Sequence, residues 1–69
     1  MSFAKWLMQF AEENSPLGDL ARDVAKDKNF PRSRRYETIY SYLEDGGASD
    51  ACMNVFEEAW EKFDGKEKF

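Results

Sequence analysis

Arginine and lysine are concentrated in one short stretch of the chain, residues 26–35. This stretch holds five cationic side chains and one acidic one, although the 69-residue chain carries a formal net charge of -4. Arginine presents planar, paired donors that suit phosphate and carboxylate groups, and free N–H groups at a helix N-terminus add positive potential. The sequence therefore predicts an anion- or partner-binding site formed by Lys28, Arg32, Arg34 and Arg35.

The same basic stretch also suits a solvated loop that balances the acidic remainder of the chain. Residues 36–69 carry a net charge of -6 and residues 1–25 a net charge of -2. This acidic background argues against broad, non-specific DNA binding, which normally uses an overall basic face. Nucleic acid or another polyanion nevertheless stays an alternative ligand, because local potential outweighs net charge within a Debye length of about 8–10 Å.

Acidic side chains cluster near the C-terminus, where Glu57, Glu58 and Glu61 form a candidate docking face for a basic partner. The alternative is the ordinary solvated face of an amphipathic helix. A chain with separate basic and acidic patches could also contact its own copies head to tail. We accordingly expect a monomer or a weakly self-associating molecule.

Residue types that support catalysis or metal binding are scarce. The chain has no histidine and a single cysteine, Cys52, which excludes a His-based triad, a Cys/His zinc site and an internal disulfide. Cys52 falls on an apolar helical stripe and reads as a small buried hydrophobe. Gly46-Gly47 lacks the Lys-Ser/Thr of a phosphate loop. We expect no enzyme activity, no cofactor and no metal.

Four helical patterns position these residues. They run from about Ser2 to Glu13, from Gly18 to Asp27, from Ser33 to the glycine pair, and from Ser49 or Asp50 to Gly65. Each has apolar residues at helical spacing and turn residues at its ends, and no strand-like alternation is present. The fold class is all-α, a compact four-helix bundle with short connections.

Aromatic residues, 16% of the chain, supply the expected core. Their helical spacing predicts burial rather than a platform that stacks on bases. This prediction covers Trp6, Phe10, Phe30, Tyr36, Tyr40, Phe56, Trp60 and Phe63. Tyr42 falls beside the stripe of its helix and is expected to be partly exposed.

Length and patterning indicate a single domain at residues 1–65 followed by a frayed tail at residues 66–69. Apolar runs are too short to cross a membrane. One thiol and no secretory signal favour a cytoplasmic location.

Taken in order along nearly the whole chain, the aromatic, proline and glycine positions resemble the YozE-like family of small proteins from Gram-positive bacteria. The matching residues are Phe3, Trp6-Leu7, Phe10, Pro16-Leu17-Gly18-Asp19-Leu20-Ala21, Asp23, Asp27, Phe30-Pro31, Tyr36, Ile39, Tyr42-Leu43, Ala48, Ala51 and Phe56-Glu57-Glu58-Ala59-Trp60. The resemblance implies a fold similar to the sterile alpha motif (SAM) and carries no catalytic residues with it. It favours a binding module that contacts an unknown protein partner through its SAM-like surface. The arginines at residues 32–35 depart from the family pattern.

Overall fold

A computed structural model describes residues 1–67 of the chain, and its side chains through Asp64. The described residues form four α-helices and one short 3₁₀ helix, with no strand among them. These elements are α1 (Phe3–Leu7), η1 (Met8–Phe10), α2 (Pro16–Lys26), α3 (Tyr36–Asp45) and α4 (Asp50–Glu67). The predicted all-α fold class is confirmed.

The first helix begins where the sequence predicts and ends earlier. The Ser2 side chain caps α1 by accepting a hydrogen bond from the Lys5 backbone N–H, 3.2 Å away. After Leu7 the chain tightens into η1 instead of continuing as α-helix to Glu13. The Arg22 guanidinium of α2 donates to the carbonyls of Ala11 (2.8 Å) and Glu13 (3.0 Å), which holds the turn after η1 against α2.

Helix α2 begins at Pro16, two residues before the predicted beginning at Gly18. Ser15 is the N-cap, and its Oγ accepts from the Gly18 N–H at 3.1 Å. Proline suits the first helical position because the missing N–H would have no helical partner there.

The third helix begins at Tyr36, later than the predicted start at Ser33. Ser33 does not cap it; the N-cap position is Arg35, whose side chain makes no capping bond. The Ser33 carbonyl instead accepts from the Phe3 N–H at 3.0 Å, which holds the segment between α2 and α3 against α1. Helix α3 ends before the glycine pair as predicted, with Gly47 in the left-handed region at φ 80°.

The fourth helix is the longest, and Ser49 caps it by accepting from the Cys52 N–H at 3.1 Å. Gly65 does not end it, because α4 continues to Glu67. A glycine inside a helix costs only about 1 kcal/mol relative to alanine. Of the predicted tail, residues 66 and 67 therefore belong to α4, and residues 68 and 69 lie outside the described part.

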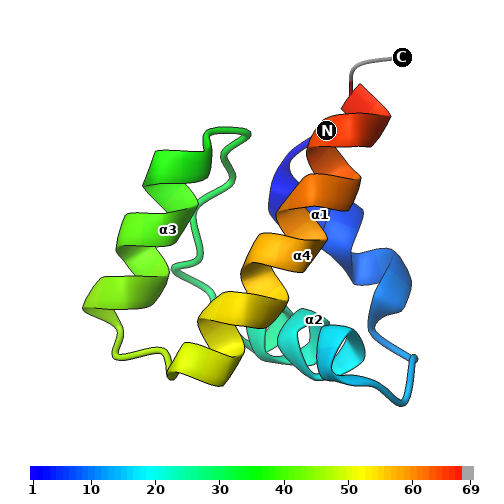
Figure 1. Ribbon diagram of the computed structural model, residues 1–69, viewed down its shortest axis with the longest axis horizontal. Helices are drawn as coiled ribbons and strands as arrows, with labels where there is room; N and C mark the ends of the chain where they lie inside the picture. Colours follow the sequence, from blue (N-terminus) through cyan, green and yellow to red (C-terminus); the bar gives the residue numbers. More distant parts are fainter. Residues whose placement is uncertain (68–69) are drawn as a thin grey trace.

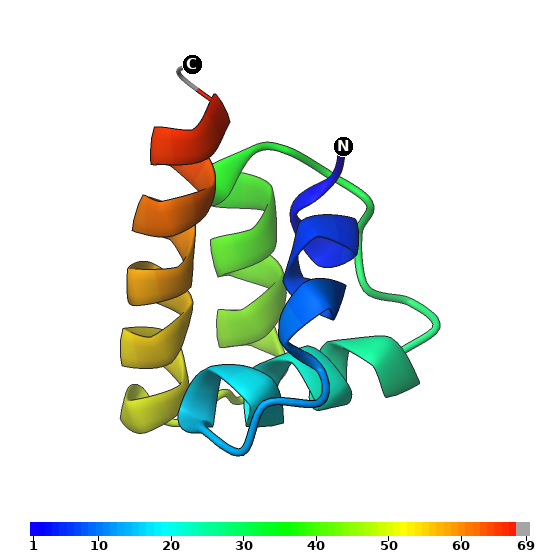
Figure 2. The same ribbon diagram turned by 90° about the vertical axis from the view of Figure 1, so that its right-hand side faces the viewer.

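Helix α4 is the central element of the bundle, since it packs against α1, α2 and α3. Figures 1 and 2 show α2 crossing the lower end of α4, and Figure 1 shows α3 to the left of α4. Among the described helices α3 packs only against α4. The buried core is Phe3, Trp6, Leu7, Leu20, Ala21, Val24, Phe30, Ile39, Phe56, Ala59 and Phe63.

The aromatic core prediction is right for Trp6, Phe30, Phe56 and Phe63. It is too generous for four other rings, which pack against the core and stay partly exposed: Phe10, Tyr36, Tyr40 and Trp60. Tyr42 is half-buried, as its position beside the apolar stripe predicts. The half-buried rings on α3 and α4 form part of the surface described below.

Candidate functional site

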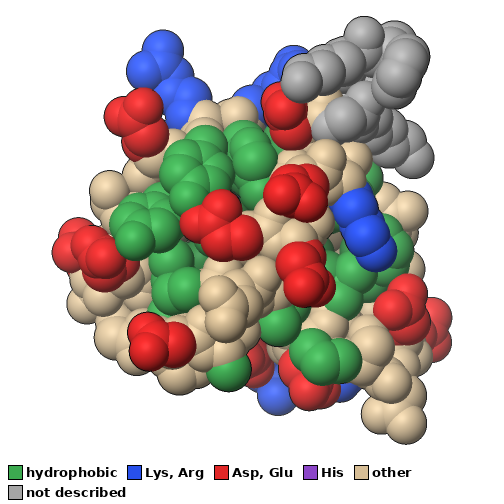
Figure 3. Space-filling model, viewed as in Figure 1, with side chains coloured by type: hydrophobic (Ala, Val, Ile, Leu, Met, Phe, Trp, Pro, Cys, Tyr) green, Lys and Arg blue, Asp and Glu red, His purple; other side chains and the backbone are tan. Residues whose placement is uncertain are grey.

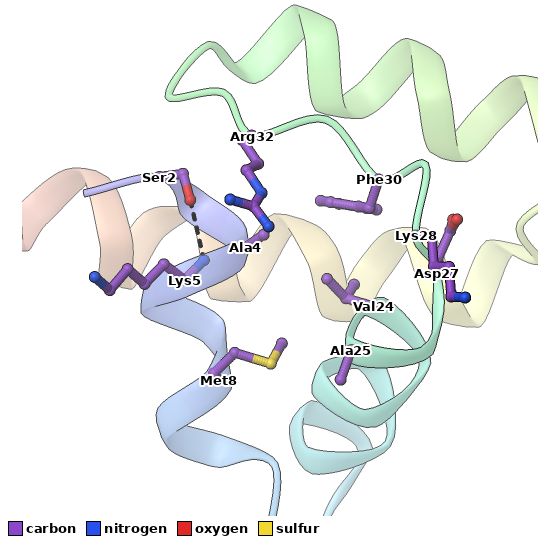
Figure 4. A pocket seen from close by; sticks show the side chains of 10 residues that line it. All are labelled: Ser2, Ala4, Lys5, Met8, Val24, Ala25, Asp27, Lys28, Phe30 and Arg32. Atoms are coloured by element: carbon purple, nitrogen blue, oxygen red, sulfur yellow. Dashed lines mark hydrogen bonds between the residues drawn. The ribbon is translucent and has the colours of Figure 1, made fainter.

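The structure does not bring the four predicted basic residues together in one site. Lys28 and Arg32 line an open groove of about 610 Å³ between α1, the end of α2 and the segment that follows it (Figure 4). Arg35 lines a separate hollow at the start of α3. Arg34 is exposed and lines neither of them.

A further lysine, Lys5 of α1, also lines this groove. Figure 4 shows the Arg32 side chain reaching from the loop toward Ala4, while Lys5 extends outward at the edge. We call the groove lined by Lys5, Lys28 and Arg32 the basic groove. Sequence reasoning missed Lys5 because it lies far from residues 26–35 along the chain, and no local pattern connects them.

The basic groove contains one acidic residue, Asp27, whose two carboxylate oxygens already accept hydrogen bonds. The Tyr42 hydroxyl donates to one oxygen at 2.5 Å, and the Asn29 N–H donates to the other at 3.0 Å. The bond to Asp27 raises the pKa of Tyr42, so that Tyr42 stays a donor. These two hydrogen bonds therefore hold the Asp27 carboxylate in place.

A second surface lies on α3 and α4, and Figure 2 shows these two helices to the left of α1 and of the segment after α2. Helices α3 and α4 carry Tyr36, Tyr40 and Trp60, each half-buried. Figure 3 shows hydrophobic side chains gathered over these two helices, with Asp and Glu side chains among and around them. We call this surface, with Glu57 and Glu61, the acidic–aromatic face.

The rings of this face touch one another and a carboxylate. Tyr36 stacks on Tyr40 with ring centroids 5.7 Å apart and meets Trp60 edge-on at 5.6 Å. The Tyr36 hydroxyl donates a hydrogen bond to Glu57 across the helix interface. That hydrogen bond, with desolvation and the charge of Glu57, raises the pKa of Tyr36 to about 12. The charge of Glu44, together with a hydrogen bond to it, raises the pKa of Tyr40.

The three predicted acidic docking residues do not share one surface. Glu57 and Glu61 lie one helical turn apart on the same side of α4. Glu58 lines a different hollow, with Lys62 and the residues that begin α2. Helix geometry alone separates Glu58 from Glu57, because adjacent helical residues point about 100° apart.

Cys52 is half-buried, and burial raises the pKa of its thiol, with a smaller effect from the charge of Asp23. Among the described residues, no group of three His, Cys, Asp or Glu side chains could hold a metal ion. None of the helices in the described part of the chain has the length and hydropathy needed to span a bilayer.

Comparison with known proteins decides the family. The family model described as the YozE SAM-like fold matches residues 2–65. The chain belongs to the YozE SAM-like family. Its all-α fold and the buried rings Phe3 and Phe56 thus belong to a SAM-like domain.

Relatives of this YozE-like chain come from Gram-positive bacteria. A UPF0346 protein of Geobacillus kaustophilus is 35% identical over 65 residues, covering 90% of each chain. UPF0346 proteins of Bacillus licheniformis and Oenococcus oeni are 34% and 36% identical, covering 90% and 88% of this chain and 89% and 84% of their own. No solved structure matches the chain.

Proposed function

We propose that this YozE-like domain is a non-enzymatic binding module that recognises a protein partner through the acidic–aromatic face. The observation that carries the proposal is the placement of three half-buried aromatic rings side by side on α3 and α4, with carboxylates around them. Aromatic side chains are enriched in protein interfaces because they bury a large area at a low entropic cost. The carboxylates favour a partner with basic side chains.

Rigidity supports a binding role for this surface. The Tyr36 ring stacks on the Phe56 ring, and its hydroxyl donates a hydrogen bond to Glu57. The side chain is therefore already fixed, and little of its conformational entropy is lost when a partner covers it. The whole face is built on two helices rather than on a loop. A preformed, partly apolar surface of this kind favours association without a conformational change.

Titratable groups argue for binding rather than catalysis. General acid–base catalysis needs a group that titrates near the working pH. The tyrosines of the face have raised pKa values, and the pKa of the Cys52 thiol is raised as well, so these groups stay protonated at neutral pH.

Photo-crosslinking tests the proposed face. A photoreactive phenylalanine analogue replaces Tyr40, and a second variant carries it at Asn14, an exposed residue on the loop before α2. Irradiation in the host cell should give a defined protein adduct from position 40 and none from position 14. The proposal is wrong if position 40 gives no adduct, or if both positions give the same one.

Polyanion binding through residues 26–35 is the second candidate function. The observation in its favour is that Lys28 and Arg32 share the basic groove with Lys5. Short single- and double-stranded oligonucleotides at low and moderate salt provide the test, since phosphate-dependent binding falls steeply as salt rises. Absence of binding at low salt would remove this candidate.

A further inference from the structure

The basic groove forms a second surface, distinct from the acidic–aromatic face. Its cations come from two parts of the chain: Lys5 from α1, and Lys28 and Arg32 from the segment between α2 and α3. All three side chains are exposed. Within the described residues, none of the three is joined to a carboxylate by an ion pair. Their charges are therefore available to a ligand.

The floor of the basic groove is apolar. Met8 is half-buried there, and the buried Val24 and Phe30 reach it from below and from the loop (Figure 4). Methionine adapts its flexible thioether to differently shaped apolar groups. A volume of about 610 Å³ falls within the range of about 300–1,000 Å³ that is typical of ligand clefts. The groove thus has space for an apolar side chain between cationic edges.

We propose that the basic groove binds a peptide segment of a partner protein in which Asp or Glu side chains flank an apolar side chain. Charge complementarity carries the choice of occupant, because the Arg32 guanidinium can bind a carboxylate through two parallel hydrogen bonds. The apolar side chain packs on Met8 and on the edges of Val24 and Phe30. Lys5 and Lys28 attract acidic side chains on either side of it.

Two features of the groove favour such a peptide over a nucleic acid. Sequence-tolerant binding of single strands uses aromatic rings on which bases stack. Phe30, the one ring among the residues that line the groove, is only 8% exposed and packs edge-on against Tyr42. The groove also offers three cations, which is few for a backbone of successive phosphates.

Peptide selection tests the proposal. A displayed library of random peptides is selected against the immobilised full chain, and the affinities of the enriched peptides are then measured.

Three variants show whether those peptides bind in the groove. Arg32→Glu reverses the charge that reaches into the groove. Ala25→Glu places a carboxylate on an exposed helical position that lines it. Lys26→Glu is the matched control, because it makes the same charge change as Arg32→Glu at an exposed residue outside the groove. Circular dichroism checks that each variant is folded.

The expected result is enrichment of peptides with acidic residues beside Leu, Phe or Met. Arg32→Glu and Ala25→Glu should each weaken their binding about tenfold or more, and Lys26→Glu should change it less than threefold. The proposal is overturned if no such peptides are enriched or if the groove variants bind them normally. It is also overturned if only an oligonucleotide binds, or if sedimentation shows that a second copy of the chain occupies the groove and Arg32→Glu abolishes the dimer. The peptide-binding outcomes do not depend on the acidic–aromatic face, so they can fail while the proposed function stands.

Discussion

The Tyr42 hydroxyl of α3 donates a hydrogen bond of 2.5 Å to Asp27, the residue that ends α2. This bond joins the end of α2 to α3, two helices whose backbones do not lie close together. The Tyr42 ring also packs edge-on against Phe30, with centroids 5.4 Å apart. Tyr42 therefore holds the segment that forms one wall of the basic groove.

Tyr42→Phe is expected to lower the free energy of unfolding, because it removes the bond to Asp27 and keeps the ring contact with Phe30. Urea denaturation measures the change. The variant should also bind acidic peptides more weakly, since the Asp27 carboxylate loses one of its two donors beside the groove. Unchanged stability in this variant would show that the bond contributes nothing net.

The Tyr36–Glu57 bond predicts a dependence of stability on high pH. The folded-state pKa of Tyr36 is about 12, above its usual value of 10.0, so the bond stabilises the fold fully below pH 10. This stabilisation is lost as the pH rises from about 10 to about 12. Thermal denaturation across this range should show a smaller decline for Tyr36→Phe than for the unmodified chain.

Glu57→Gln separates the charge of Glu57 from its hydrogen-bonding capacity. The amide oxygen still accepts from Tyr36, but the negative charge is gone, so the pKa of Tyr36 should fall toward 10.0. The absorbance of tyrosinate measures it in a background that carries Tyr40→Phe and Tyr42→Phe, where Tyr36 is the one tyrosine left. An unchanged or higher pKa of Tyr36 in the Glu57→Gln variant would show that the charge of Glu57 does not raise it.

Gly18→Ala is expected to destabilise the fold by about 1–3 kcal/mol or more. A Cβ at Gly18 would lie 1.9 Å from the Glu13 carbonyl oxygen and 3.0 Å from that of Phe10, so the backbone before α2 must move. Gly46→Ala is the matched control, since its Cβ would lie 3.4 Å from the nearest atom. Equal losses in the two variants would mean that the close approach at Gly18 is not what requires glycine there.

Phe3→Ala is expected to cost about 3–5 kcal/mol, which would largely unfold a domain of this size. Phe3 is fully buried and its ring lies within 5.8 Å of those of Trp6, Phe56, Trp60 and Phe63. Trp60→Ala should cost less, because Trp60 is partly exposed. Calorimetry that shows the reverse order would place the centre of the core elsewhere.

The amino-acid sequence alone determined the all-α class and those helix ends that local residues set, such as the start of α1 and the end of α3. Ser2 as a cap and the glycine pair after α3 act on neighbouring residues, so their effects can be read along the chain. The helical period likewise identified the buried helix faces on which Phe3 and Phe56 lie. The same period also predicts that Glu57 and Glu58, as adjacent helical residues, point in different directions.

Tertiary structure decided what depends on distant residues. The turn after η1 is held against α2 because Arg22, eleven residues beyond Ala11, donates to the carbonyls of Ala11 and Glu13. The basic groove exists because the Phe3–Ser33 bond brings the Arg32 segment beside Lys5. Local sequence patterns contain neither contact, since each forms only when separate segments pack around the same core.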